Sequence, residues 1–165
     1  MIGKPKIEER AAQPYVGIRT QVPIRKFRTV IPRLLDEVFT WLKERNIAPD
    51  GPPFMRHHVI NMEALMDIAL AVPVAEAIEG DDRVVGGELP AGRYAALIYT
   101  GVKNGIKGNG ALLEWGAQQG LQWDRWDDES GEAFGARIEW FLTDPDNEPD
   151  DTKWETEVAI RLAEG

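Results

Sequence analysis

Hydrophobic residues recur along the chain in two patterns, one typical of helices and the other typical of strands. From Phe27 to Asn46 the apolar residues repeat at intervals of three and four, which predicts a long amphipathic helix. Pro32 falls inside this stretch. A proline is tolerated in the first turn of a helix, so we expect the regular helix to begin near Thr29 as its N-cap; otherwise Pro32 predicts a kink.

A second, weaker helical stripe is formed by Ile106, Leu113 and Ala117. It predicts a helix over about 109–119 that ends at Gly120. The segment GIKGNG at 105–110 is rich in glycine but lacks the GK[ST] of a phosphate-binding loop and does not complete GxGxxG. We interpret it as a loop that enters the second helix.

Strands are predicted where apolar and polar residues alternate or where short apolar runs are bounded by turn residues. The segments 83–88 and 93–100 flank the turn LPAG, so we expect them to pair as a hairpin, with 93–100 central and covered. The segment 64–72 is rich in helix formers but is predicted as a strand from the repeat described next. The remaining predicted strands are 15–22, 54–60, 135–143 and 153–162.

Two distant segments resemble each other. MDIALAV at 66–72 aligns with TEVAIRL at 156–162, which places Asp67 on Glu157, and the same order of elements surrounds each copy. The predicted fold is therefore of the α+β class, with two pseudo-symmetric strand-helix-strand-strand repeats, about 14–74 and about 83–162. We expect a single domain over 1–165, with a mainly antiparallel sheet, two long helices and a ligand groove that Asp67 and Glu157 both face by symmetry.

Composition limits the classes of protein. The 165 residues are 43% hydrophobic, contain no cysteine, show no secretory signal and include no apolar run near the roughly 20 residues that span a membrane. We therefore expect a cytoplasmic protein without disulfides or membrane contacts. The 28 acidic and 19 basic residues give a net charge of −9, which disfavours nucleic acid and favours cationic or neutral ligands.

Metal and cofactor sites are not expected. The two histidines, His57 and His58, are adjacent, and neighbours in a strand point to opposite faces, so they are poorly placed to share a metal. No cofactor motif is complete.

Four segments, in the order HHVINMEALMDIALAVPV, LPAGRYAALIYTG, EWFLTDP and WETEVAIRL, resemble the GyrI-like small-molecule-binding domain. This domain is also the effector-binding half of multidrug-responsive transcription activators. The resemblance covers about Tyr15 to Leu162. It implies a ligand groove between the sheet and paired helices, with a deep glutamate that attracts lipophilic cations. Matching by motif places the glutamate of the final TE strand at Glu157 and that of the E-x-F/Y-L-x-D-P strand at Glu139.

Two features differ from the family pattern. Many relatives carry histidine where this chain has Tyr99, and no helix-turn-helix precedes the domain. The resemblance therefore implies a stand-alone binder rather than a DNA-binding regulator. A subfamily of stand-alone relatives hydrolyses strained cyclopropane rings of DNA-alkylating compounds inside an aromatic cage, so a protective hydrolase stays the alternative.

Both functions would use the same groove. As a binder of planar, hydrophobic and often cationic molecules, the protein is expected to use its groove glutamates and aromatic walls. As a hydrolase, Glu157 or Glu139 would activate water, and Tyr99 would hydrogen-bond the developing oxyanion. The candidate ligand contacts are Glu157, Glu139, Tyr99, Phe141, Trp115, Trp123 and Trp140.

Plainer interpretations stay open for several of these residues. From its strand pattern alone Glu157 is a solvated surface residue, and Trp140 lies on an apolar strand face typical of core. Taking the family resemblance into account, we expect Glu157 to face the ligand groove. A general base at His57 or His58 is less favoured. The expected partner is a small aromatic or cationic molecule, and a homodimer stays open.

Overall fold

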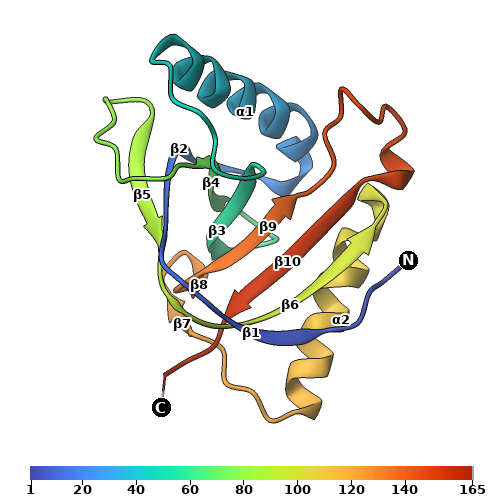
Figure 1. The fold of residues 1–165 in the computed structure, drawn as a ribbon. Coiled ribbons are helices and arrows are strands. Elements are labelled where there is room, and N and C mark those ends of the chain that lie inside the picture. The colour runs from blue at the N-terminus through green and yellow to red at the C-terminus, as the bar shows by residue number, and fades with distance from the viewer. Residues whose placement is uncertain (165) are drawn as a thin grey trace.

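A curled antiparallel sheet forms the body of the molecule, and two long helices cover one of its faces. The structure, a computed structural model, describes residues 1–164 (Figure 1). The helices are α1 (Phe27–Glu44) and α2 (Gly105–Gln118). The ten strands are β1 (Lys6–Arg10), β2 (Gln13–Val22), β3 (Phe54–Ile60), β4 (Met66–Pro73), β5 (Val85–Leu89), β6 (Gly92–Thr100), β7 (Arg125–Asp128), β8 (Gly131–Phe134), β9 (Arg137–Phe141) and β10 (Glu155–Arg161).

The strand order is β1-β6-β10-β9-β3-β4-β2-β5, with the β7-β8 hairpin attached to β3. The two central strands, β9 and β3, pair with Met55 opposite Glu139. The chain forms strand, helix, strand, strand twice, as β2-α1-β3-β4 and as β6-α2-β9-β10, with the β7-β8 hairpin inserted between α2 and β9. The sheet is therefore built about its centre in the symmetric way that the repeat predicts, and the α+β class is confirmed.

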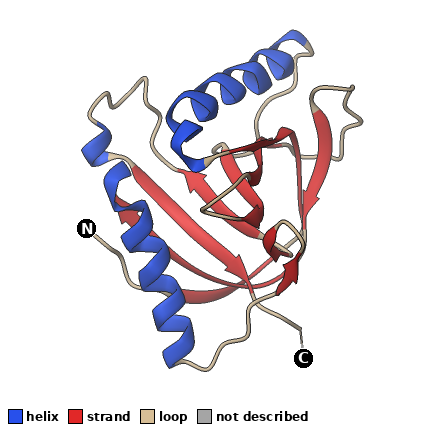
Figure 2. Ribbon diagram, turned by 180° about the vertical axis from the view of Figure 1, so that it is seen from behind, coloured by secondary structure: helices blue, strands red, loops and turns tan. Residues whose placement is uncertain are grey.

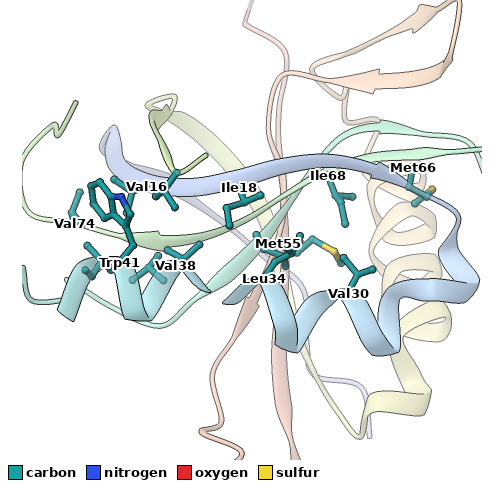
Figure 3. Packing of buried hydrophobic residues seen from close by; sticks show 14 residues of the cluster. Val16, Ile18, Val30, Leu34, Val38, Trp41, Met55, Met66, Ile68 and Val74 are labelled. Atoms are coloured by element: carbon teal, nitrogen blue, oxygen red, sulfur yellow. The ribbon is translucent and has the colours of Figure 1, made fainter. Parts of the chain in front are cut away.

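Helix α1 packs on the half of the sheet formed by β2, β3 and β4. Its buried residues come from the stripe predicted from the sequence: Val30, Leu34, Val38, Trp41 and Leu42. Figure 3 shows this stripe facing Val16 and Ile18 of β2 and Ile68 of β4. Burial of each large aliphatic side chain contributes about 1.5–3 kcal/mol, so this interface anchors the helix.

Helix α2 covers the other half of the sheet, over β6 and β10. Its Leu112 is fully buried with Leu97, Tyr99, Val158 and Ile160. Figure 2, which looks onto the helices, shows α1 and α2 on the same side of the sheet, spread like the arms of a V. The strip of sheet between them belongs to the central strands.

The opposite face of the curled sheet holds a separate core. It contains small and aromatic side chains from both halves of the sheet, with Trp140 packed against them: Tyr15, Phe54, Ala71, Leu89, Tyr94, Ala96, Ala136, Ile138 and Ala159. The rings of Phe54 and Trp140 lie 4.6 Å apart between their centroids. Small residues let the sheet curl around these rings.

Both helices begin earlier than the sequence predicts. Helix α1 starts at Phe27, so Thr29 is not its N-cap, and Pro32 lies inside the helix. A single missing N–H is offset here by the burial of the stripe that follows. Helix α2 starts at Gly105, so the glycine-rich segment 105–110 is helical and not an entering loop.

The predicted hairpin of 83–88 with 93–100 is wrong. Strand β5 pairs with β2, and β6 pairs with β10 and β1, which places β5 and β6 in opposite halves of the sheet. The LPAG turn connects the two halves because each strand finds its partner within its own half. Strands β1, β7 and β8 were not predicted. The strand over 64–72 is confirmed as β4. Within residues 1–164, neither helix is long and apolar enough to cross a membrane.

Candidate functional site

Glu139 lies at the centre of the sheet, on the face that carries the helices. It is only 8% exposed. Its Oε2 lies 2.8 Å from Nε2 of His57, and its Oε1 accepts hydrogen bonds from the Tyr99 hydroxyl at 2.7 Å and the Asn109 amide at 3.3 Å. Three different elements, β3, β6 and α2, thus converge on one carboxylate.

His57 reaches Glu139 because β9 and β3 are neighbours and both side chains point to the helix face. His57 and His58 point to opposite sides of the sheet by strand alternation, and a bulge in β3 shifts the register just after them, between His57 and Val59. His57 is 5% exposed, and the ring of Phe27, at the start of α1, lies 6.5 Å from it between centroids. The site therefore touches both helices.

Close packing of α2 on Tyr99 explains one glycine of the 105–110 segment. A Cβ at Gly108 would lie 2.6 Å from Cδ2 of Tyr99, closer than real Cβ contacts allow. Glycine lets the helix rest on the ring, and the next residue, Asn109, then reaches the Glu139 carboxylate. The glycine pattern is thus a packing requirement of the site.

A buried arginine, Arg137, lies next to this cluster but does not pair with Glu139 directly. Its Nη2 donates to Oδ1 of Asn109 at 2.8 Å, and its guanidinium lies 4.8 Å from the centroid of the Phe134 ring. Asn109 thus bridges the arginine and the carboxylate. Within residues 1–164, Nε of Arg137 and Nδ1 of His57 are buried without a hydrogen-bond partner.

The cluster favours the charged form of Glu139. Burial alone would raise the pKa of this carboxyl, but the hydrogen bond and charge of His57, together with the hydrogen bonds of Tyr99 and Asn109, outweigh burial and lower the pKa from 4.5 to about 2. Burial and the neighbouring Glu139 charge raise the pKa of Tyr99. At neutral pH the site therefore holds a carboxylate beside a neutral phenol.

Glu139 is covered by its neighbours and is only 8% exposed. Two hollows within residues 1–164 lie away from it, one beside Trp41 on α1 and one beside Tyr15 on the far face of the sheet. Side chains between the helices close over the carboxylate. No set of three or more metal-ligating side chains converges within the same residues.

Glu157 occupies a different environment. It pairs in register with Trp140 and Ile98, whereas Glu139 pairs with Val158, so the two glutamates point to opposite faces of the sheet. Glu157 accepts a hydrogen bond from Nη2 of Arg10 at 2.7 Å. The expectation that Glu157 and Glu139 line one groove is therefore wrong. Val158 lies opposite Glu139 and shares its face, and Glu157, the residue before Val158, points to the other face.

Asp67, which the repeat places on Glu157, also lies on the face away from the helices and is also paired. Arg19 donates to both of its carboxylate oxygens, at 2.9 and 2.8 Å. The symmetry between the two acids is real, but it concerns two ion pairs and not the cluster around Glu139.

Comparison with known proteins now identifies the fold. A model of the family described as GyrI-like small molecule binding domain matches residues 3–163. The chain belongs to the GyrI-like family. No curated protein matches its sequence significantly.

Solved structures share the GyrI-like fold at low identity. The C-terminal domain of EcmrR has a TM-score of 0.71 at 15% identity, and all of each chain is covered. EcmrR in a complex with DNA has a TM-score of 0.75 at 16% identity, over 98% of this chain, which spans 58% of the EcmrR chain. A hydrolase from Listeria innocua has a TM-score of 0.63 at 12% identity, covering 97% of this chain and 92% of that one.

A fourth GyrI-like structure contains a ligand. SAV2435 bound to tetraphenylphosphonium has a TM-score of 0.60 at 11% identity, covering 97% of this chain and 94% of that chain. At these identities the likeness shows the fold alone.

The GyrI-like structure brings together only part of the predicted site. Glu139 and Tyr99 are in contact, and Phe141 follows Glu139 on the same face of β9. Trp140 belongs to the core on the opposite face. Trp115 and Trp123 pack around Leu112 and Leu162 beneath α2, as part of its hydrophobic core. The aromatic residues near Glu139 are therefore Tyr99 and Phe141, and not the expected tryptophans.

Three members of the cluster were not identified as site residues from the sequence. His57 was considered only as a less favoured base, and Asn109 and Arg137 were not proposed. Asn109 reaches Glu139, 30 residues away in the chain, because the preceding Gly108 of α2 packs against Tyr99 of β6. In the sequence, the glycine-rich segment 105–110 indicates this close packing only if the segment is known to be helical.

Proposed function

We propose that this small-molecule-binding domain takes up a small, hydrophobic cation at Glu139, between α1 and α2, and acts as a xenobiotic-binding or sequestering protein. The observation that carries the proposal is the state of this carboxylate. It is buried and charged, yet within residues 1–164 its recorded ion pair is with His57 and with no lysine or arginine. A carboxylate in this state is a ready counter-charge for an exogenous cation.

The surroundings suit an aromatic or lipophilic ligand. Tyr99 lies against the carboxylate, Phe27 lies beside His57, and Phe141 shares the helix face of β9. Aromatic faces attract cations and present flat apolar walls. The net charge of −9 favours the approach of cations from solution.

Binding requires that the cover over Glu139 opens. The first turns of α2 supply this cover through Asn109, and they contain Gly105, Gly108 and Gly110. Glycine lowers helix stability by about 1 kcal/mol per position relative to alanine. We therefore expect the N-terminal half of α2 to move when a ligand enters, while Leu112 keeps the rest of the helix in place.

The test measures binding of tetraphenylphosphonium by titration calorimetry and by quenching of tryptophan fluorescence, with wild type and Glu139→Gln. Loss of the carboxylate should weaken binding of the cation by about 1–3 kcal/mol, which is roughly 5- to 150-fold in affinity. Binding of neutral triphenylphosphine oxide should be unchanged. Circular dichroism and the unfolding midpoint establish that each variant is folded.

Glu157→Gln is the matched control, because it removes the same charge from the opposite face of the sheet. Its affinity for tetraphenylphosphonium should stay within about twofold of wild type. Tyr99→Phe provides a second variant that keeps the carboxylate. If Glu139→Gln and Glu157→Gln weaken binding equally, general electrostatic attraction accounts for it and the proposed site is incorrect.

A protective hydrolase is the second candidate, and it is favoured by the direct contacts of Glu139 with both Tyr99 and His57. Here the oxygen of a water molecule bonds to a carbon of a strained cyclopropane, and its proton passes to Glu139. The electrons of the broken C–C bond reach the conjugated carbonyl oxygen, which Tyr99 hydrogen-bonds until the proton held by Glu139 is returned to that oxygen through solvent.

Mass spectrometry after incubation with a cyclopropane-containing DNA alkylator distinguishes the two functions. A product heavier by one water that forms with wild type and Glu157→Gln but not with Glu139→Gln supports the hydrolase. Tight binding of tetraphenylphosphonium without any water adduct supports the sequestering domain alone.

A further inference from the structure

A small hollow that contains basic side chains lies on the face of the sheet away from the helices. It has a volume of about 150 Å³, enough for about five water molecules. It is enclosed by β2, β3, β4 and β5 and lined by Tyr15, Gly17, Arg19, His58, Ala69, Val85 and Gly86. The small side chains among these residues leave the space between Arg19 and His58 unfilled.

The charged groups around this cavity carry an excess of positive charge. Arg19, whose side chain is 52% exposed, uses Nε and Nη2 to bind Asp67, and within residues 1–164 its Nη1 has no hydrogen-bond partner. Arg56 donates to the hydroxyl of Tyr15 at 3.1 Å and to the main-chain oxygens of Glu88 and Gly135. Within residues 1–164 Arg56 has no carboxylate partner. Two guanidinium groups therefore face one carboxylate.

His58 supplies an unsatisfied polar atom at this place. Its Nε2 is buried and has no hydrogen-bond partner within residues 1–164. Arg19 and Tyr15 face it from β2, Asp67 from β4, and Arg56 and His57 lie beside it on β3, whereas β5 contributes only Val85 and Gly86. Burial, followed by the charges of Arg56 and Arg19, lowers the pKa of His58 from 6.5 to about 4. A buried nitrogen without a partner costs free energy that a ligand would recover.

We propose that this cavity binds a small oxyanion, a carboxylate or a phosphate, between the guanidinium of Arg19 and the imidazole of His58. The anion accepts hydrogen bonds from Nη1 of Arg19 and from Nε2 of His58, and it offsets the uncompensated charge of Arg56. An anion here favours protonated His58, so binding takes up a proton and strengthens as the pH falls. The site is independent of the cation site, because it lies on the opposite face of the sheet.

The test follows the imidazole signals of both histidines by NMR during titration with acetate and, separately, with inorganic phosphate. Saturable binding should shift the His58 signals, raise the pKa of His58 by about 2.5 units and leave the His57 signals unshifted. Affinity should be about tenfold higher at pH 5.5 than at pH 8. Acetate and phosphate together distinguish a carboxylate site from a phosphate site by their relative affinities.

Two variants keep the proposal falsifiable. His58→Gln should weaken binding about tenfold at the lower pH and remove most of its pH dependence. Ala69→Ile fills the cavity without changing any charge and should abolish the saturable response, whereas Arg28→Gln on the surface of α1 should have no effect. The thermal midpoint of each variant reports whether it is folded. A response that does not saturate, or that survives Ala69→Ile, overturns the proposal.

Discussion

Glu139 and Glu157 lie on adjacent strands of one sheet, but their surroundings differ in every respect that matters for binding. Glu157 is on the face away from the helices and is bound to Arg10. Glu139 is on the helix face and is held by His57, Tyr99 and Asn109, with no arginine or lysine in contact. The first carboxylate already has its counter-charge, while the second is stabilised mostly by hydrogen bonds.

The proposed cation site depends on this difference. Direct pairing with arginine would satisfy Glu139 and leave little free energy for a ligand. Arg137 is close but is turned to Asn109 and Phe134, so the amide separates the two charges. His57, Tyr99 and Asn109 hydrogen-bond the carboxylate, and no lysine or arginine neutralises it directly.

The largest expected effect concerns acid stability. Because the folded-state pKa of Glu139 is lowered from 4.5 to about 2, its carboxylate stabilises the fold fully above about pH 4.5, and this contribution is lost as the pH falls towards 2. The shift corresponds to about 3 kcal/mol of free energy of unfolding. Wild type should therefore lose about 3 kcal/mol more than Glu139→Gln over this interval, measured by urea unfolding at a series of pH values.

Glu157→Gln again provides the comparison. Over the same interval its stability should differ from that of wild type by no more than about 1 kcal/mol, the value expected for a partly exposed ion pair. Equal profiles for wild type and Glu139→Gln would mean that the Glu139 carboxylate gains nothing from its three partners, and the contrast between the two glutamates would disappear.

A smaller effect tests the packing that brings Asn109 to Glu139. Gly108→Ala places a methyl group against the Tyr99 ring, where its Cβ would lie 2.6 Å from Cδ2, and should destabilise the protein by about 1–3 kcal/mol. Gly110→Ala, two residues further on, meets nothing within 4 Å and should stabilise α2 by about 0.5–1 kcal/mol. Chemical denaturation of both variants measures the difference.

The direction in which Gly110→Ala changes stability, compared with Gly108→Ala, is the more informative result. Two alanines in one helix that change stability in opposite directions show that contact with Tyr99, and not helix propensity, makes glycine necessary at position 108. If Gly108→Ala is also stabilising, α2 does not rest on Tyr99 as the structure shows.

Sequence patterns predict the two halves of the sheet and the stripe of α1 because these depend on periodicity. Val30, Leu34 and Val38 repeat at the interval of a helix, and their burial follows directly. The pairing of β5 with β2 does not follow from periodicity, because strand partners depend on contacts between residues far apart in the chain. Adjacent strands joined by a short turn are only the most common arrangement.

The same limit applies to the site. The family motif indicates Glu139 and Tyr99, and these are in contact. Alternation within a strand also shows that Glu157 and Val158 point to different faces, but the relation between Glu157 and Glu139 depends on the register of β10 with β9. One residue of register decides whether two acids share a face, and neither strand carries this information alone.

The smallest expected effect is the loss of the Arg10–Glu157 ion pair. Glu157→Gln removes one carboxylate from Arg10, which retains hydrogen bonds to Glu8 at 2.9 and 2.6 Å. The pair is partly exposed, with 21% of the Arg10 side chain and 13% of the Glu157 side chain accessible. We expect a loss of about 0.5–1 kcal/mol in low salt that shrinks in high salt, measured by urea unfolding at two ionic strengths.

The buried Glu139 should show little salt dependence in the parallel experiment, because ions do not reach it. A salt-independent loss above about 2 kcal/mol for Glu157→Gln would instead place both glutamates in equally dry surroundings. The distinction between a satisfied carboxylate and an available one would then have to rest on partners alone.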